Sequence, residues 1–212
     1  MKALIFTSIF FSSIAIAADS DIYGTFEVRF TPTTIQGTTQ ACHLAYKAVI
    51  QENAYEQGAV YAVVGNIGVG IGEDRRNMVS TLKVTVNKID LKNPNNLIPK
   101  KPYFAYLKAP NGVNNAKSFF KGMDSDTAGG IFSIYKIDEN FSEIYGQMIE
   151  KKTVSVVFNL AKNSMDIVVP LDLTVESVNE KGQRTHSSKA LEDFSRCTRP
   201  LFKEALANSQ KK

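Results

Sequence analysis

The sequence predicts an α+β domain, a largely antiparallel β-sheet with two or three helices packed on it. Three observations support this prediction. Apolar and polar residues alternate in several stretches, residues near both ends follow helical spacing, and each of the two predicted terminal helices carries a cysteine on its apolar side. The 212 residues contain no internal repeat and no interdomain linker. Residues 18–212 are therefore expected to form a single domain.

The first seventeen residues have the three zones of a secretory signal peptide. Lys2 supplies a positive charge, residues 4–16 are uncharged and mostly apolar, and Ala15-Ile16-Ala17 has the pattern that a signal peptidase accepts. We expect cleavage between Ala17 and Ala18 and export to the bacterial periplasm. The alternative is a membrane anchor, but the apolar run is shorter than the roughly 20 residues that a span needs. No membrane span is expected after cleavage.

Cys42 and Cys197 are the only cysteines and stand near opposite ends of the exported chain. In an oxidising compartment two such cysteines are expected to form a disulfide, with two buried free thiols as the alternative. The bond would stabilise the fold by roughly 4–5 kcal/mol in the chain-entropy view. A zinc site is not expected, because two distant cysteines with one nearby histidine lack the spacing of zinc ligands.

The first third of the exported chain predicts one strand and one helix. Residues 23–30 alternate, with three apolar side chains on one face, as in a half-buried strand. Residues 39–57 predict a helix that ends at Gly58, because Cys42, Ala45 and Val49 share one helical face. The disulfide would join this helix to the C-terminal helix.

The middle of the chain predicts β-structure and two long loops. Residues 59–64 and 78–91 are predicted strands, the second with a bulge or bend. The glycine-rich stretch between them indicates a turn or a close approach of the backbone, and 103–107 is a further strand. Residues 92–102 and 108–130 are predicted loops.

The last third predicts strands and helices in alternation. Residues 131–137 form a strand, and Asp138 caps a helix that ends at Lys151-Lys152. Residues 153–160 and 165–175 form a hairpin. Ser187 or Ser188 caps a final helix with Cys197 on its apolar face, and a break or restart is expected at Pro200.

Two motifs resemble ligand sites but lack essential parts. The glycines at 65, 68, 70 and 72 do not have the G-x-G-x-x-G spacing of a dinucleotide site. Residues 124–130 resemble the start of a calcium loop, yet the twelfth position is Tyr135 instead of the glutamate that would bind the cation. A turn is the simpler interpretation of this segment.

The catalytic signatures of common hydrolases are missing from the sequence. His43 and His186 are the only histidines, and neither belongs to a nucleophile or zinc motif. A pair of carboxylates close in space would not be visible at this level. The formal net charge of +4 comes mainly from scattered lysines, without the dense basic stripe that nucleic acid requires. We expect no enzymatic activity, no cofactor, no metal and no nucleic-acid partner.

Residues 138–201 carry a resemblance to a known group of proteins. An amphipathic helix is followed by Lys-Lys-Thr-Val-Ser-Val-Val-Phe (151–158), Asp-Ile-Val-Val-Pro-Leu-Asp-Leu (166–173), and Ala190-Leu191-x-x-Phe194-x-x-Cys197. This order resembles small periplasmic proteins similar to invasion-associated locus B and to type VI secretion accessory proteins. The resemblance implies a β core with a helix laid across it, and no catalytic signature.

The long loop at 108–130 is the predicted binding segment. Phe119 and Phe120 would be its apolar anchors, flanked by Lys117 and Lys121; the alternative is that both rings fill the core. We expect a non-enzymatic periplasmic protein that binds a protein or other envelope component, of the exclusion, immunity or inhibitor type. A secretion-system accessory, a small secreted hydrolase and a small-ligand carrier are the alternatives.

Overall fold

The larger of two main sheets contains seven strands, and every pairing in it is antiparallel. The computed structural model describes residues 22–72 and 75–209; the predicted cleavage site at Ala17 and Ala18 lies outside them. The strands are β1 (Gly24–Ile35), β2 (Thr38–Glu52), β3 (Ala59–Ile71), β4 (Met78–Ile89), β5 (Leu97–Pro99), β7 (Phe119–Asp124) and β8 (Gly130–Lys136). Their order is β1-β2-β3-β4-β8-β7, and β5 pairs with β4 beside β8.

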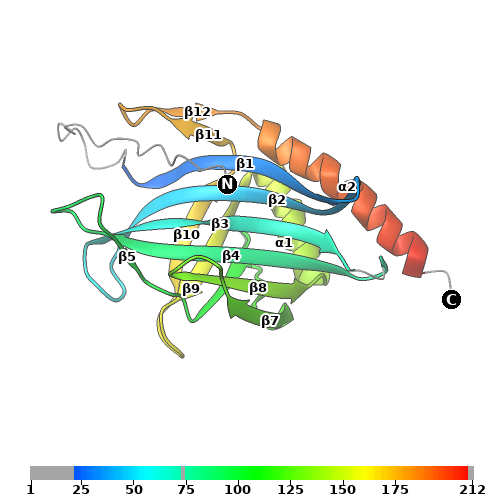
Figure 1. Ribbon diagram of the computed structural model, residues 1–212, viewed down its shortest axis with the longest axis horizontal. Helices are drawn as coiled ribbons and strands as arrows, with labels where there is room; N and C mark the ends of the chain where they lie inside the picture. The colour runs from blue at the N-terminus through cyan, green and yellow to red at the C-terminus, as the bar shows by residue number, and fades with distance from the viewer. Residues whose placement is uncertain (1–21, 73–74, 210–212) are drawn as a thin grey trace, which may run out of the picture.

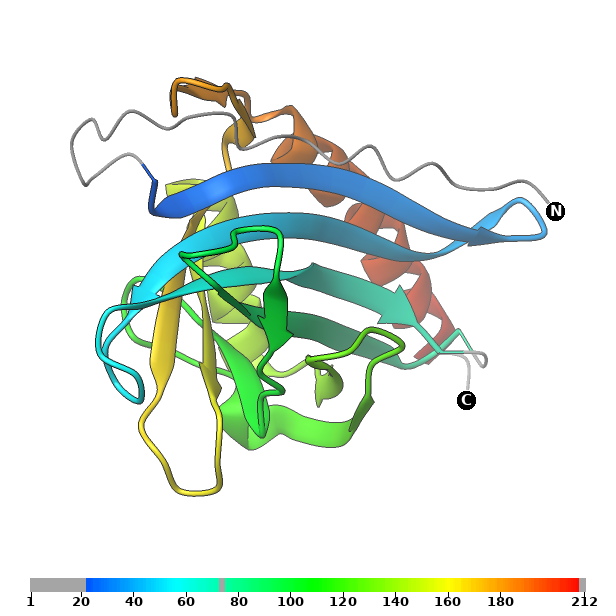
Figure 2. The same ribbon diagram turned by 60° about the vertical axis from the view of Figure 1, so that its left-hand side comes forward.

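A smaller sheet and two helices lie behind the larger sheet in Figure 1. The smaller sheet has the order β10-β9-β6, from β6 (Phe104–Lys108), β9 (Thr153–Asn159) and β10 (Ile167–Asp172). The helices are α1 (Glu139–Lys151) and α2 (Lys189–Ser209), with a short 3-10 helix η1 (Ala116–Ser118) and a hairpin of β11 (Val175–Val178) and β12 (Arg184–His186). Figure 2 shows both helices behind the curved sheet.

The core lies between the larger sheet and these elements. Leu44, Ile67 and Leu82 pair side by side on β2, β3 and β4, and each is at most 1% exposed. They belong to one cluster with Phe141 on α1 and Phe158 on β9. We call this face of the sheet the inner face, and the opposite face, with Ala45, Asn66 and Lys83, the outer face.

The prediction of an antiparallel α+β fold is confirmed, but the predicted helix over 39–57 is wrong. Most of these residues form β2, in which alternate side chains from Cys42 to Ile50 are buried. The alanines at 41, 45 and 48 gave the stretch an apparent helical face, because they place apolar residues at helical intervals among the larger apolar residues. Pairing with β1 on one side and β3 on the other outweighs the helix propensity of alanine.

Residues 65–71 of the glycine-rich stretch belong to one continuous strand, β3, and Gly72 follows its end. At Gly65 the reason for glycine is a close approach of the backbone. A Cβ there would collide with the carbonyl of Lys83 and would come within 2.7 Å of the Tyr46 hydroxyl. The missing side chain lets Tyr46 reach across β3 and donate a hydrogen bond to that carbonyl at 3.1 Å.

Both predicted loops contain strands. Residues 92–102 include β5, which pairs with the end of β4, and 108–130 include η1 and β7. Neither strand shows an alternation of apolar and polar residues in the sequence, because β5 is three residues long and β7 is exposed along its whole length.

Most elements predicted in the last third match the structure, although the strand predicted over 165–175 ends at Asp172 and Val175 begins β11. β8, α1 and the β9–β10 hairpin lie where they were expected, and Asp138 accepts the capping hydrogen bond from the Phe141 backbone N–H. The break predicted at Pro200 is wrong, since α2 continues through it to Ser209. Pro200 lies on the exposed side of α2, so the backbone hydrogen bond that a proline cannot donate is missing where the helix faces solvent.

The disulfide between Cys42 and Cys197 is present, and it joins a strand to a helix instead of joining two helices. Cys42 is fully buried on the inner face of β2, and Cys197 lies on α2, with 6.0 Å between their Cα atoms. The bond fixes α2 across the ends of β1, β2 and β3. Within the described residues, neither helix has the length and apolarity that crossing a membrane demands.

We expect replacement of Asp138 by alanine to destabilise the protein by about 0.5–2 kcal/mol, because the N-cap of α1 is lost. Partial burial acts to raise the pKa of Asp138, but hydrogen bonds from Ser118 and the Phe141 backbone outweigh it and lower this pKa. The stabilisation is therefore present above the ordinary pKa of an aspartate and lost as the pH falls through the lowered value. Urea unfolding at several pH values measures this.

Asp138→Asn is the matched control, because asparagine caps a helix without a charge. It should retain most of the stability at neutral pH and lose the acid-dependent part. Equal slopes against pH for the wild type and Asp138→Asn would contradict the prediction.

Candidate functional site

The strand β7 forms one edge of the larger sheet. It pairs with β8 on one side, and no other strand of the described chain pairs with its opposite side. All six of its residues are exposed. Figure 1 shows it at the lower border of the sheet. We call this strand together with Lys117 the β7 edge.

The two phenylalanines predicted as anchors have different environments. The Phe119 ring packs edge-on against Tyr135 at 5.8 Å and Phe104 at 5.3 Å between ring centroids. Phe120 stands at an irregularity in the pairing of β7 with β8 and is 62% exposed. Phe119 thus attaches the strand to the core, whereas Phe120 projects into solvent. Neither ring is buried in the core, and the role of Phe120 as an anchor stays a prediction.

Lysines border the exposed ring. Lys117 lies on η1 and Lys121 on β7, and both are exposed. Lys136, on the neighbouring strand β8, is also exposed. The acidic member of the strand, Asp124, is engaged by Lys101, whose Nζ lies 2.6 Å from its Oδ1. The centre of the β7 edge is therefore basic.

An apolar strip continues from the edge onto the outer face. Met123 pairs with Phe132 on β8, and Lys121 pairs with Ile134. Met123 is 44% exposed, and the two β8 side chains are half-buried. Sequence reasoning missed Met123, because the irregularity between Phe119 and Lys121 is what turns it to the outer face, away from the side of Phe119. The edge thus offers free backbone groups with apolar and basic side chains beside them.

The segment that resembles a calcium loop is occupied by ion pairs. Asp124 binds Lys101, and Asp126 binds Lys83 at 2.6 Å. Hydrogen bonds from Lys83, Ser125 and Thr127 lower the pKa of Asp126 to about 2. In the described ranges, no three residues of the His, Cys, Asp or Glu types gather as metal ligands would.

The two histidines lie apart on different elements. Burial lowers the pKa of His43, on the outer face of β2, and its Nε2 lies 3.2 Å from the Thr33 hydroxyl. His186 Nδ1 lies 2.8 Å from the Thr174 hydroxyl, which donates its proton to Asp172 at 2.7 Å. Thr174 is therefore the acceptor from His186, so His186 does not act as a base toward this hydroxyl.

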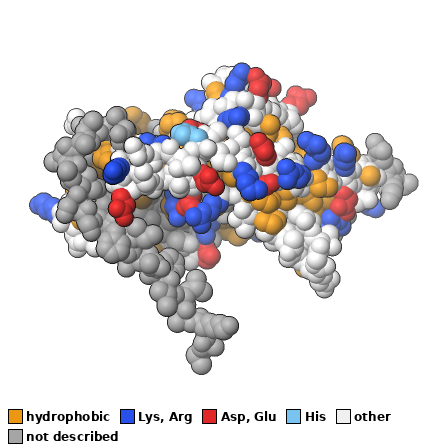
Figure 3. All heavy atoms as spheres, turned by 90° about the horizontal axis from the view of Figure 1, so that it is seen from above, with side chains coloured by type: hydrophobic (Ala, Val, Ile, Leu, Met, Phe, Trp, Pro, Cys, Tyr) orange, Lys and Arg blue, Asp and Glu red, His pale blue; other side chains and the backbone are white. Residues whose placement is uncertain are grey.

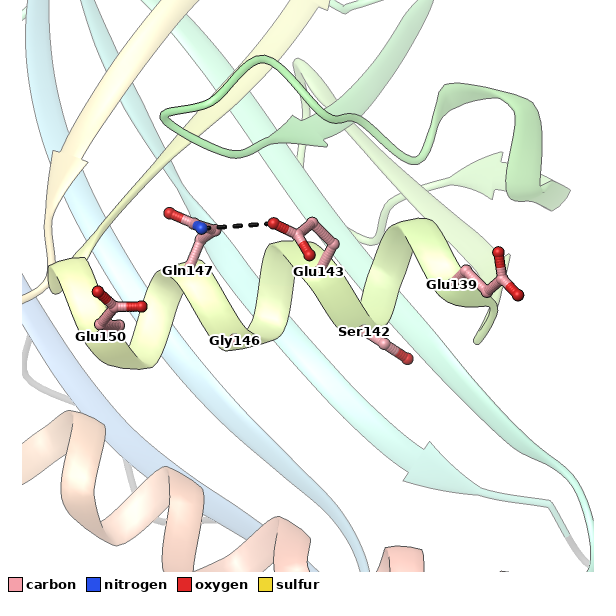
Figure 4. Close-up of a pocket in the computed structure, with 6 residues that line it drawn as sticks. All are labelled: Glu139, Ser142, Glu143, Gly146, Gln147 and Glu150. Carbon is pink, nitrogen blue, oxygen red and sulfur yellow. Dashed lines mark hydrogen bonds between the residues drawn. The ribbon is translucent and has the colours of Figure 1, made fainter.

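A shallow hollow on the exposed side of α1 is lined by acidic and neutral side chains (Figure 4). Glu139, Glu143 and Glu150 project outward along the helix, and Gln147 donates a hydrogen bond to Glu143 at 3.3 Å. The carboxylates follow the helix axis and do not converge on a common point. The one hydroxyl of its lining, on Ser142, donates to the Asp138 carbonyl oxygen at 2.9 Å, and the lining contains no cation, so the hollow has the chemistry of a solvated helix face.

On the face seen from above, lysines and arginines are interspersed with aspartates and glutamates (Figure 3). Such mixing gives no basic stripe on that face.

No family model matches the chain, and no curated protein or solved structure matches it either. The resemblance of residues 138–201 stays a prediction.

Proposed function

We propose that this chain is a non-enzymatic periplasmic protein that binds an extended acidic segment of another envelope protein along the β7 edge. The observation that carries the proposal is an edge strand with all six residues exposed and one side unpaired within the described chain. An extended peptide can add to such an edge through its backbone, while side-chain contacts select its sequence.

Charge favours an acidic segment over a second copy of the chain. Lys121 stands in the middle of β7, with Lys117 just before it. Two β7 edges pairing with each other would bring these lysines together, and lysine on an edge strand is a common protection against such pairing. A segment with carboxylates beside the lysines and an apolar residue against Phe120 has no such penalty.

Strand addition suits the exclusion, immunity or inhibitor type of function. A partner segment held as an extra strand is withdrawn from its own assembly, without any chemical step. The Cys42–Cys197 disulfide supports an oxidising compartment, where such bonds persist. An oxidising compartment agrees with the export predicted from the N-terminal residues.

Phe120→Ala is expected to weaken binding of an acidic strand-forming peptide by about tenfold or more, since exposed aromatic anchors carry much of the energy of such contacts. The probe is a synthetic peptide that alternates glutamate with valine, measured by calorimetry. Lys121→Glu should also weaken this peptide and should strengthen its lysine–valine counterpart. Phe120 is mostly exposed, so its replacement should change stability by no more than about 0.5 kcal/mol.

Met165→Ala is the matched control, because Met165 is equally exposed at 62% but lies on the β9–β10 turn. It should leave peptide binding unchanged. Equal binding of the acidic and basic peptides, or full binding by Phe120→Ala, would refute the proposal. In cells, Phe120→Ala should abolish protection against phage or toxin challenge, and protection that survives removal of residues 1–17 would rule out a periplasmic site.

A further inference from the structure

The outer face of the larger sheet contains a cavity of about 360 Å³ away from the β7 edge. Ala45, Gly65 and Asn66 form its floor on β2 and β3. Arg29 and Lys47 stand on one side, and Lys83 stands on the other. The small floor residues leave the space open, and its size falls within the range of small-molecule sites. We call it the outer-face groove.

Buried polar atoms without partners gather at this face. Asn66 Oδ1, in the floor, has no hydrogen-bond partner within the described residues. In the next row of paired residues on β2, β3 and β4, His43 Nδ1 and Thr81 Oγ1 also lack hydrogen-bond partners within the described residues. These two atoms converge above Gly68, where a Cβ would collide with both. Thr81 is only 9% exposed. Since buried polar atoms are normally paired, Asn66 Oδ1, the one of these three whose residue lines the groove, is the atom that a polar group of a ligand would complete.

The charges around the outer-face groove favour an anion. Glu27 is shared between Arg29 and Lys47, whose Nζ lies 2.6 Å from it, so one carboxylate serves two cations. Across the groove, the Lys83 side chain is 23% exposed and is held by Asp126, whose side chain is 85% exposed. A largely exposed carboxylate on a mostly buried lysine side chain is an anion that a ligand can replace, because solvent already screens it.

We propose that the outer-face groove binds a small hydroxylated organic anion, such as a sugar acid or a sugar phosphate. Its acidic group replaces Asp126 on Lys83, and a hydroxyl group bonds to Asn66. A hydroxyl suits an amide side chain because it both donates and accepts, and an amine is disfavoured beside three cations. None of the residues that line the groove belongs to the β7 edge, so the two sites can be tested separately.

The test is calorimetric titration with D-glucuronate, neutral D-glucose and inorganic phosphate. D-Glucuronate should bind, and D-glucose should bind much more weakly. Asp126→Asn should tighten D-glucuronate binding about two- to fivefold, because the competing carboxylate is removed. Lys83→Met should weaken it at least about tenfold, as expected for a lost hydrogen bond to a charged group. Asn66→Ala should weaken D-glucuronate but leave inorganic phosphate unchanged.

A second lysine–aspartate pair provides the controls. Lys101 and Asp124 are also 2.6 Å apart but lie outside the groove lining. Asp124→Asn and Lys101→Met make the same charge changes and should leave D-glucuronate binding unaltered. Failure of D-glucuronate to bind, equal binding of D-glucose, or equal effects of the two lysine variants would overturn the proposal. Phe120→Ala should bind D-glucuronate normally, which separates this site from the β7 edge.

Discussion

Phe194→Ala is expected to lower the free energy of unfolding by about 3–5 kcal/mol, the range for removing a fully buried aromatic ring. Phe194 is 0% exposed on α2, and its ring centroid lies 6.1 Å from that of Tyr145 on α1. Tyr145 in turn shares a 2.7 Å hydrogen bond with Thr198 on α2. Removal of the Phe194 ring would therefore weaken the packing of α2 against α1 as well as against the sheet. Urea unfolding monitored by circular dichroism measures the effect.

Phe120→Ala is the matched control for this substitution, because it deletes the same ring at an exposed position. It should change stability by no more than about 0.5 kcal/mol. A small effect at Phe194 would show that α2 is not packed as the structure describes. A large effect at Phe120 would instead mean that its ring contributes to the core, and the β7 edge would lose its anchor.

Cys197→Ser is expected to destabilise the protein by about 2–5 kcal/mol, because the disulfide constrains the unfolded chain across 155 residues. Cys42 is fully buried, so the freed thiol would remain in the core without a partner. Thermal or urea unfolding measures the change. Free-thiol labelling of the denatured, unreduced wild type should give no signal.

Reduction of the wild type supplies the comparison for the disulfide. The reduced wild type and Cys197→Ser should have nearly the same stability, since both lack the same cross-link. Reducing agent should leave Cys197→Ser unaffected. A variant as stable as the oxidised wild type would show that α2 is held by packing alone.

The sequence was sufficient where local signals and burial agree. The Asp138 cap, the positions of β8, β9 and β10, and the apolar face of the last helix all follow from residues close together in the chain. The same holds for the cysteine pair, because the chain has no third cysteine to compete. Phe119 and Phe120 were identified as one segment, but their different exposures depend on Phe104 and Tyr135, which are distant in sequence.

Tertiary structure decided what local spacing left ambiguous. Residues 39–52 have alanines at helical intervals and apolar side chains at every second position, and only the neighbours β1 and β3 select the strand. The outer-face groove depends on pairings that bring Asn66 beside Ala45 and Lys83. Helix capping and disulfide chemistry act through a few residues, so the sequence by itself determined them. Sheet register acts between distant strands, so only the folded chain places the groove and the exposed β7 edge.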